Sequence, residues 1–469
     1  MEPFAERKKF PACPSLWGII GPGIIWMALA QGSGELIWWP YIIAKYGLAF
    51  LFLLIPACLL QYPVNYEIGR YTLLTGESIF QGFFRLHRRL AIFLWILMTI
   101  SFLWFGAFAS AGGTALAALT HIPAGWSVRG QTYFWSYFSI GVFLIALLVS
   151  RHVYRLIEKA MMIVAGVTFV GLVVACCHPT VIEVLPSFLK GLFVPPALSQ
   201  PFDFADSTKL LTAFAFAGLG GFWTLFYSYW LREKGVGMAA YQSRYQDRNS
   251  REHIVPAPGA LPQEDHFLRN NYCRWRRFLL VDSGIGIFGN LLTTLMTCLL
   301  AFAVLFPQKL YPEAYQIAVV QSEFFRLMWG PLGGLLFLLV AAAFLADTWL
   351  ATVDALSRAQ TDIVYHVFPQ SRKKGVSWWY TFFILAFTVI TGTTLCFEAP
   401  GPLILLSAVI GFAGTVLFTG ALLRLNHYFL KRQLPPMCRP TKMSGYLLWV
   451  AFVVYLVLAV GYCVARFLV

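Results

Sequence analysis

Apolar segments long enough to cross a lipid bilayer fill most of the sequence. A crossing helix needs about 20 predominantly apolar residues, and eleven stretches of the 469-residue chain meet that length. Because every backbone polar group must be satisfied inside the bilayer, such segments fold as helices. We therefore predict an all-α membrane protein with eleven transmembrane helices. They run about 17–43, 47–74, 90–119, 132–150, 156–177, 208–231, 278–306, 331–357, 377–396, 401–424 and 444–467.

The distribution of Lys and Arg gives the chain an orientation. With the N-terminus placed in the cytoplasm, 28 of the 35 Lys and Arg fall on the cytoplasmic side and 7 fall outside. Such an excess in cytoplasmic loops is the usual signature of membrane topology. The net charge of +14 therefore reflects topology, and we expect no nucleic-acid partner. We expect an integral, multi-pass protein of the plasma (cell inner) membrane with a cytoplasmic N-terminus.

Two glycine-rich stretches interrupt apolar segments. Gln31-Gly32-Ser33-Gly34-Glu35 interrupts the first segment and Gly218-Leu219-Gly220-Gly221 the sixth. A helix from Trp17 to Gln31 rises about 21 Å, which brings the first break near the middle of the bilayer. Glycine is costly inside a helix unless the backbone unwinds, and unwound backbone at this depth must line a cavity. Paired breaks in two halves predict the midplane site of a secondary transporter.

The positions of the breaks divide the chain into two five-helix halves. The first helix starts inside and the sixth starts outside, so we expect the halves to be inverted repeats within one transporter domain, residues 1–469. The polar stretch 236–272 is favoured as a solvated linker over a regulatory or partner-binding segment. The expected parts are a cytoplasmic N-terminus (1–16), a first five-helix repeat (17–177), a second repeat (208–424) with a cytoplasmic insert (232–277), and an extra helix (444–467).

Candidate substrate ligands surround the breaks. Ser33 can cap the half-helix that follows, and Glu35 falls in its first turn, where the macrodipole favours a carboxylate. Glu35 either stabilises only that helix terminus or binds a coupling ion or proton, and its depth favours the second role. The second break favours substrate binding over close helix packing. The predicted substrate-binding residues are Gln31, Gly32, Ser33, Gly34, Glu35, Gly218, Leu219, Gly220, Gly221, Trp223, Thr224 and Tyr227. The predicted metal ligands are Ser33 and Glu35.

The eighth apolar segment carries a polar stripe. Asp347 and Asp354 are seven residues apart and share a helix face with Arg358. Asp354 and Arg358 are spaced for an i,i+4 ion pair, and Glu67 and Arg70 in the second segment are spaced for a local i,i+3 pair. Asp347 has no local cation. It is either a second ion-coupling residue or a buried hydrogen-bond acceptor.

The sequence contains no catalytic constellation. No Gly-Xaa-Ser-Xaa-Gly elbow, His-Glu-Xaa-Xaa-His pair or phosphate loop occurs. The nine cysteines have neither metal-ligand nor redox spacing. We predict that the protein is not an enzyme and has no cofactor, and that its partners are a small-molecule or ion substrate and the lipid bilayer.

The order of these features resembles the Nramp (natural resistance-associated macrophage protein-like) family of metal-ion transporters, within the LeuT-type superfamily. The resemblance covers nearly the whole chain at the level of architecture. It implies a LeuT-like 5+5 inverted repeat with discontinuous helices 1 and 6, and metal-ion symport. The local matches are Gly21-Pro22-Gly23, the first break, Thr75-Gly76-Glu77-Ser78, Arg155-Leu156-Ile157-Glu158-Lys159 and Tyr227-Ser228.

Both breaks depart from the metal-binding motifs of that family. The family has Asp-Pro-Gly-Asn where this chain has Gly32-Ser33-Gly34-Glu35, so the ligating Asp is replaced by Gly32. The family has Met-Pro-His-Asn where this chain has Gly220-Gly221-Phe222-Trp223, so the soft sulfur that suits transition metals is missing. The remaining oxygen donors favour Mg²⁺, Mn²⁺ or a monovalent ion.

These observations predict an Nramp-like secondary active transporter that works by alternating access. Its substrate is a metal or other cation, bound without the standard transition-metal ligands. The glycines also permit a wider cavity, so a larger or organic solute is a second possibility. A non-transporting sensor or scaffold on the same fold is a third.

Overall fold

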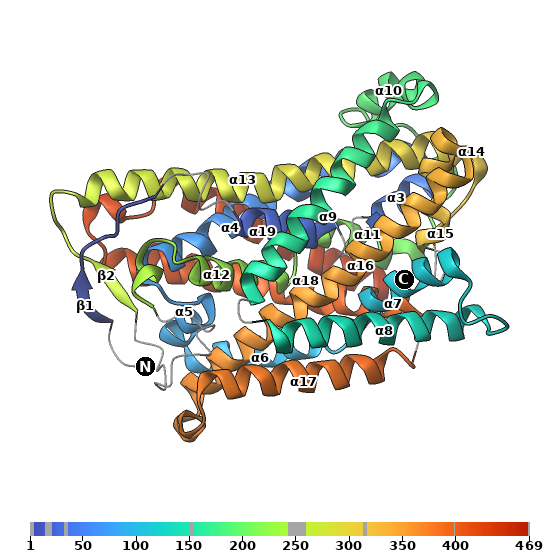
Figure 1. Cartoon of the computed structure of the whole chain (residues 1–469). Helices are drawn as coiled ribbons and strands as arrows, with labels where there is room; N and C mark the ends of the chain where they lie inside the picture. The colour runs from blue at the N-terminus through green and yellow to red at the C-terminus, as the bar shows by residue number, and fades with distance from the viewer. Residues whose placement is uncertain are drawn as a thin grey trace.

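Long helices run side by side through the computed structural model of the protein (Figure 1). The structure describes residues 4–14, 21–31, 36–150, 153–242, 259–312, 317–397 and 399–467. Within these residues, nine helical stretches are long and apolar enough to cross a membrane. The predicted helical, membrane-spanning architecture is confirmed at this level.

The first half of the chain ends with an outlying helix, α10, which the sequence interpretation did not predict. The elements of this half are α2 (Pro22–Ala30), α3 (Leu36–Tyr46), η2 (Gly47–Leu53), α4 (Leu54–Thr75), α5 (Ile79–Leu86), α6 (Arg88–Ser101), α7 (Gly106–Thr120), α8 (Val128–Val149), α9 (Val153–Cys176) and α10 (Pro179–Gly191). Local chemistry sets some boundaries. Gly76 ends α4 in a left-handed conformation, and Ser78 begins α5 with a capping box to Gln81.

The second half contains the longest helix, α16, which has non-helical backbone at Trp329 and Gly330. Its elements begin with η3 (Phe204–Asp206), α11 (Ser207–Phe216), α12 (Trp223–Lys234), η4 (Gly237–Tyr241), α13 (Leu268–Leu300), η5 (Ala301–Leu305), α14 (Phe306–Gln308) and α15 (Ile317–Gln321). They continue with α16 (Glu323–Val367), η7 (Pro369–Lys373), α17 (Val376–Thr394), α18 (Pro400–Arg424), η8 (Leu425–Phe429), η9 (Leu430–Arg432), η10 (Pro436–Cys438) and α19 (Lys442–Phe467).

The second predicted helix break interrupts the bundle, whereas the first lies outside the described residues. In the first apolar segment α2 ends at Ala30 and α3 begins at Leu36, and residues 32–35 lie outside the described residues. In the sixth segment α11 ends at Phe216 and α12 begins at Trp223. In Figure 1, α3 and α11 lie toward one end of the bundle and α12 toward the other.

Two short strands correct the expectation of a purely helical chain. Strand β1 (Ala5–Lys8) pairs in parallel with β2 (Ala260–Pro262), with Ala5 opposite Ala260 and Lys8 opposite Pro262. Neither segment alternates apolar and polar residues, and the pairing joins parts of the chain more than 250 residues apart. Local periodicity therefore carries no signal for it.

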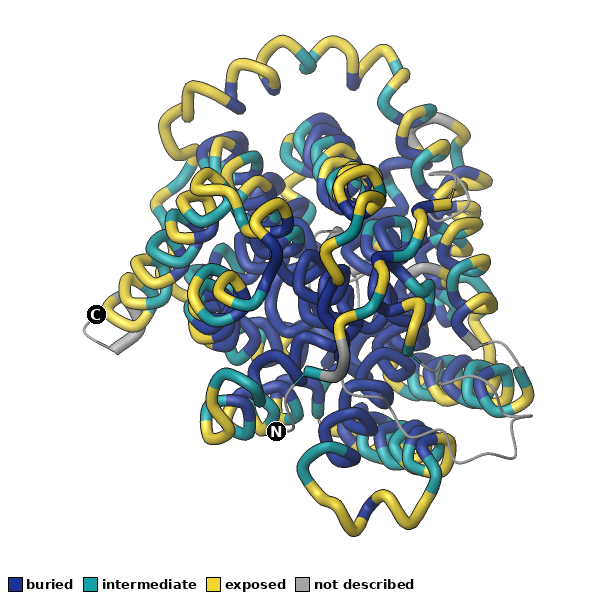
Figure 2. The backbone as a smooth tube through the Cα atoms, turned by 90° about the vertical axis from the view of Figure 1, so that its left-hand side faces the viewer, coloured by how far each residue is buried: buried dark blue, intermediate teal, exposed yellow. Residues whose placement is uncertain are grey.

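Buried residues occupy the middle of the bundle, and large apolar side chains remain exposed around its rim (Figure 2). Ile163 and Val170 of α9 are 67% and 61% exposed, and Phe138 of α8 is 55% exposed. A soluble protein rarely exposes apolar surface so extensively. This rim is the surface that a membrane-spanning bundle presents to lipid.

Candidate substrate site

The break between α11 and α12 is held open by its own backbone conformation. Gly218, Leu219 and Gly221 all have positive φ angles, of 76°, 64° and 67°. Leucine rarely adopts this left-handed conformation, which costs about 1–2 kcal/mol in a residue with a side chain. The Thr224 hydroxyl donates a hydrogen bond to the Leu219 carbonyl at 2.8 Å. Local strain of this kind is typical of functional sites.

Close packing explains why glycine is used at the second break. A Cβ atom on Gly220 would lie 1.6 Å from the Ala215 carbonyl oxygen. A Cβ atom on Gly221 would lie 3.5 Å from the Cα atom of Gly411 in α18. The first position therefore excludes any side chain sterically, whereas the second only disfavours one through its φ angle.

We expect Gly220→Ala to prevent folding and Gly221→Ala to be tolerated with a loss of about 1–2 kcal/mol. The difference follows from a clash with backbone in the first case and from conformational strain alone in the second. The yield of monodisperse protein and the thermal unfolding temperature would measure it. Gly141→Ala is the matched control, because its Cβ would meet nothing within 4 Å. Normal folding of Gly220→Ala would contradict the geometry.

Trp26 connects the two broken helices. Its indole Nε1 donates a hydrogen bond to the Gly218 carbonyl at 2.9 Å. Its ring lies edge-on to Tyr227, with centroids 5.3 Å apart. The Tyr227 hydroxyl in turn donates to Asp282 Oδ2 at 2.8 Å. The predicted residues Gly218 and Tyr227 are therefore brought together by Trp26 and Asp282, which the predicted site did not include.

Trp223 and Thr224 use their polar atoms within the protein. Trp223 Nε1 donates to the Thr352 hydroxyl on α16 at 3.1 Å, and its ring contacts Phe102 and Phe216 edge-on. The Thr224 hydroxyl is bonded to the break itself. In this conformation both residues support the site rather than present a polar group to a solute.

Buried carboxamides lie around the breaks. Gln31 is the C-cap residue of α2, and Gln61 of α4 lies beside Gly218 and Gly220. Asn65 follows Gln61 by one helical turn, and Asn290 of α13 shares a face with Asp282. All four carboxamides are at most 2% exposed. Among the described residues, neither amide atom of Gln31, Asn65 and Asn290 has a hydrogen-bond partner, nor does Oε1 of Gln61.

Asp347 is a buried carboxylate in the middle of α16. It is 3% exposed, and within the described part of the chain its oxygens have no side-chain hydrogen-bond or ion-pair partner. Helix α16 contacts α2, α7, α9 and α12, so it packs against halves of both broken helices. An unpaired ionisable group at such a position is expensive and usually functional.

The first break itself is outside the described residues. Gly32, Ser33, Gly34 and Glu35 belong to this segment, so the predicted ligands Ser33 and Glu35 are not located. Among the residues that the structure does describe, no three His, Cys, Asp or Glu gather in a group that could hold a metal ion.

The ends of α3 and α11 that lie away from the breaks are joined at Asp206. Its carboxylate accepts hydrogen bonds from Lys45 Nζ at 2.6 Å and from the Tyr46 hydroxyl at 2.8 Å, and forms an ion pair with Lys209 Nζ at 3.0 Å. Burial raises the pKa of the Asp206 carboxyl, but the bonds from these groups outweigh it and hold the pKa below its ordinary value. The carboxylate therefore stays charged, and the bonds persist, at any pH above about 4.

The opposite end of α12 is held by ion pairs to α16 and α9. Arg358 of α16 lies 2.7 Å from Glu233 Oε1 at the end of α12 and binds Asp354 through Nε at 2.8 Å. The predicted pair of Asp354 and Arg358 is thereby confirmed. Lys234 Nζ of α12 contacts Glu158 Oε1 of α9 at 2.5 Å. The far ends of α3 and α11 are therefore bonded to each other through Asp206, and the far end of α12 is bonded to α16 and α9.

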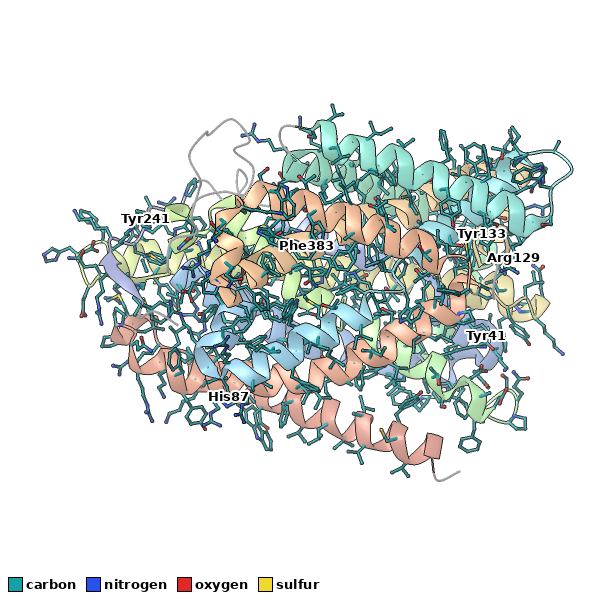
Figure 3. All side chains as sticks on the ribbon, turned by 90° about the horizontal axis from the view of Figure 1, so that it is seen from below. Tyr41, His87, Arg129, Tyr133, Tyr241 and Phe383 are labelled. Carbon is teal, nitrogen blue, oxygen red and sulfur yellow. The ribbon has the colours of Figure 1, made fainter. Side chains whose placement is uncertain are left out.

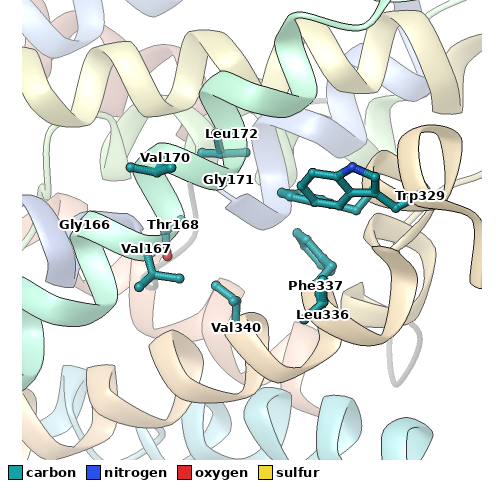
Figure 4. A pocket seen from close by; sticks show the side chains of 11 residues that line it. Gly166, Val167, Thr168, Val170, Gly171, Leu172, Trp329, Leu336, Phe337 and Val340 are labelled. Carbon is teal, nitrogen blue, oxygen red and sulfur yellow. The ribbon is translucent and has the colours of Figure 1, made fainter. Parts of the chain in front are cut away.

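A groove of about 430 Å³ lies apart from the breaks, between α9 and α16 (Figure 4). Its lining is almost entirely apolar and includes Val167, Trp329 and Phe337. Val167 and Leu336 are about half exposed at its edge. The groove therefore belongs to the lipid-facing surface and not to the candidate site.

The fold is shared with solved transporter structures. A mutant of the Eremococcus coleocola manganese transporter superposes with a TM-score of 0.63 at 15% identity, covering 97% of this chain and 88% of that one. Mhp1, a nucleobase-cation-symport-1 family transporter with bromovinylhydantoin bound, gives 0.55 at 13% identity, covering 96% and 88%. MhsT in complex with L-phenylalanine gives 0.57 at 13% identity, covering 95% and 98%. No protein-family model and no curated protein matches the chain.

At these identities the likeness establishes the fold. The helical fold expected from the sequence is therefore confirmed as one shared with the manganese transporter, Mhp1 and MhsT, and the chain is an integral, multi-pass membrane protein.

Proposed function

We propose that the protein is a secondary active transporter that works by alternating access, with its substrate site between the two helix breaks. The bond from Trp26 to the Gly218 carbonyl carries this proposal, because it brings the interrupted helices together in the interior. Such broken helices bind substrate near the bilayer midplane in transporters built from inverted repeats. The shared fold with three solved transporter structures supports the same function.

We also propose the finer topology. Counting α2 with α3, and α11 with α12, as one interrupted crossing each gives eleven crossings. They divide into repeats of five, 17–177 and 208–424, followed by α19. The distribution of Lys and Arg supports a cytoplasmic N-terminus in the plasma (cell inner) membrane. The Arg358 ion pairs then lie on the cytoplasmic side and Asp206 on the outside.

The leading substrate class is a hard cation. Glu35 supplies the negative charge, Ser33 and the backbone carbonyls of the breaks supply neutral oxygens, and Asp347 is the second candidate for ion coupling. Oxygen donors of this kind suit Mg²⁺, Mn²⁺ or a monovalent ion better than a soft transition metal. One of the structural neighbours is a manganese transporter.

A neutral organic solute is the second candidate. Gln31, Gln61, Asn65 and Asn290 are buried with amide atoms that lack partners among the described residues. Buried polar groups are normally hydrogen-bonded, so these amides favour a ligand that offers both donors and acceptors. Mhp1, which shares the fold, is solved with a hydantoin bound.

An uptake screen in proteoliposomes separates the two candidates. It would test Mg²⁺, Mn²⁺, Na⁺, neutral heterocycles and amino acids under ion gradients. If the substrate is a cation, we expect Glu35→Gln to reduce its uptake by at least about tenfold, equivalent to 1.4 kcal/mol. Glu183→Gln, an exposed position on α10, is the matched control. Full activity of Glu35→Gln would remove Glu35 from the site, and uptake of a neutral solute alone would favour the second candidate.

A further inference from the structure

Helix α10 lies crosswise to the long helices of the bundle. Figure 1 shows it nearly end-on, outside the bundle and toward the end at which α3 and α14 lie. In Figure 2, which looks along the bundle, α10 is the topmost element and runs across the view. It follows almost directly after α9, and its 13 residues are too few to cross a bilayer. Helix α10 is therefore not one of the membrane crossings.

The position of α10 along the bundle corresponds to one surface of the bilayer. The helix contacts η2, which begins directly where α3 ends. A Cβ atom on Gly191 of α10 would lie 2.9 Å from Leu48 Cβ in η2, so the two elements pack closely. Figure 3 shows Tyr41, Arg129 and Tyr133 at this same end of the bundle. Tyrosine is enriched where a membrane protein passes from lipid to water, so this end lies at the bilayer surface.

One face of α10 is covered by the bundle. Val181, Phe188 and Gly191 are its buried residues. They are spaced by seven and three positions and therefore share one helix face. Contacts with η2, η5 and α13 supply the cover.

A neighbouring face of α10 is apolar as well, but the protein leaves it exposed. Ile182, Leu189 and Phe193 are 53%, 49% and 78% exposed, and Pro186 is exposed between them. Phe193 belongs to the turn that continues the helix, since its N–H donates to the Lys190 carbonyl at 3.1 Å. Spacings of four, three and four place all four side chains on one face, here called the uncovered stripe.

The remaining face of α10 is polar. Its exposed residues are Thr180, Glu183, Ser187 and Lys190, spaced by three, four and three positions. At 3.6 residues per turn, Ser187 and Leu189 point about 200° apart around the helix. The helix is therefore amphipathic even among the side chains that the bundle does not cover.

We propose that α10 is an interfacial helix whose uncovered stripe inserts among the acyl chains at the surface of the bilayer. The polar face then lies toward headgroups and water, the arrangement of amphipathic helices that lie in the plane of a membrane. Through Gly191 and Leu48 this helix ties the turn that follows α3 to the bilayer surface.

Two observations favour lipid over a second protein as the partner of the uncovered stripe. Val170 and Val173 are exposed on the last two turns of α9, so the lipid-facing surface of α9 leads into α10. The stripe also has only four side chains, whereas a stable protein interface uses about 20–30 residues on each side.

Spin labels on the two faces of α10 test the proposal in the full-length protein in phosphatidylcholine nanodiscs. Leu189→Cys and Ser187→Cys form one matched pair, and Ile182→Cys and Thr180→Cys form a second pair two turns earlier. All four positions are exposed, so the substitutions leave the core intact. The parent protein carries serine in place of the four exposed cysteines, Cys177, Cys273, Cys396 and Cys463. Electron paramagnetic resonance would measure the collision rates of each label with oxygen, which concentrates in lipid, and with a nickel chelate, which stays in water.

We expect the ratio of oxygen to nickel collisions to be at least about tenfold higher for Leu189→Cys and Ile182→Cys than for their partners, because only the stripe is immersed in lipid. Equal, water-like ratios within each pair would overturn the proposal. Low collision rates with both reagents at Leu189→Cys would overturn it too, because protein would then cover the stripe. A lipid-like ratio for all four labels would contradict a helix at the surface. The readout requires no transported solute, so it is independent of the uptake screen.

Discussion

Replacing Arg358 by Met should lower the free energy of unfolding by about 3–5 kcal/mol, the usual cost of breaking a buried ion pair from one side. The guanidinium is fully buried and contacts carboxylates on two helices, Asp354 on α16 and Glu233 on α12. Methionine has a similar length but no charge, so both carboxylates would lose their bonds to the guanidinium. Thermal unfolding of the purified protein in one detergent would measure the loss.

A double-mutant cycle distinguishes this mechanism from lost packing. Glu233→Gln removes one of the two carboxylates that Arg358 neutralises. If the ion pairs are responsible, Glu233→Gln will cost clearly less in the Arg358→Met background than in the parent protein. Arg358→Lys tests the geometry, because an ammonium group keeps the charge but cannot hold both oxygens of Asp354 as the guanidinium fork does. Strictly additive costs would contradict the interpretation.

The backbone break between α11 and α12 could be predicted from the sequence because its cause is local. Three glycines among the four residues 218–221, within an apolar segment, leave the backbone free to adopt left-handed angles, and the structure has positive φ at Gly218, Leu219 and Gly221. The same reasoning applies to ion pairs within one helix. Asp354 with Arg358, and Glu67 with Arg70, were predicted from their spacing and are confirmed.

The long-range partners carried no comparable signal. Glu233 meets Arg358 across two helices that are far apart in sequence, and Arg232 meets Asp362 in the same way. Neither spacing nor composition indicates which of many charged residues will face each other after the helices pack. The strand pair β1–β2 is a further example, since each strand has no more than four residues.

The side chains around the second break were harder to predict than its backbone. Trp26 was missed because a tryptophan in an apolar helix is usually a packing residue, and its bond to Gly218 depends on tertiary structure. Gln61 was missed for the same reason, although a carboxamide in an apolar helix was a usable signal. Conversely, the hydroxyl of the predicted ligand Thr224 donates a hydrogen bond to the Leu219 carbonyl. That hydroxyl therefore stabilises the break in this conformation.

Asp347→Asn is the second substitution with a large expected effect, and it should act on ion coupling rather than on folding. Asp347 is buried without a side-chain partner in the described part of the chain, so its charge is not needed to neutralise another residue. Asparagine keeps the shape and removes the cost of a buried charge. We expect the unfolding temperature to be unchanged or higher, while gradient-driven uptake falls by at least about tenfold, or 1.4 kcal/mol.

Ion binding at Asp347 can also be measured through its effect on the stability of the protein, which requires no known substrate. An ion that binds only the folded protein stabilises it by about 2.7 kcal/mol at 100 times its dissociation constant. If Asp347 binds the coupling ion, one of Na⁺, Mg²⁺ or Mn²⁺ will raise the unfolding temperature of the parent protein and not that of Asp347→Asn. Asp354→Asn is the informative control, because its carboxylate is bound to Arg358: it should lose stability yet keep its response to the ion. The two aspartates lie seven residues apart on one helix face, but only Asp354 is paired with Arg358. Loss of the ion response in Asp347→Asn and its retention in Asp354→Asn would therefore distinguish a coupling site from a structural one. A response that survives in Asp347→Asn would instead identify Asp347 as a buried hydrogen-bond acceptor.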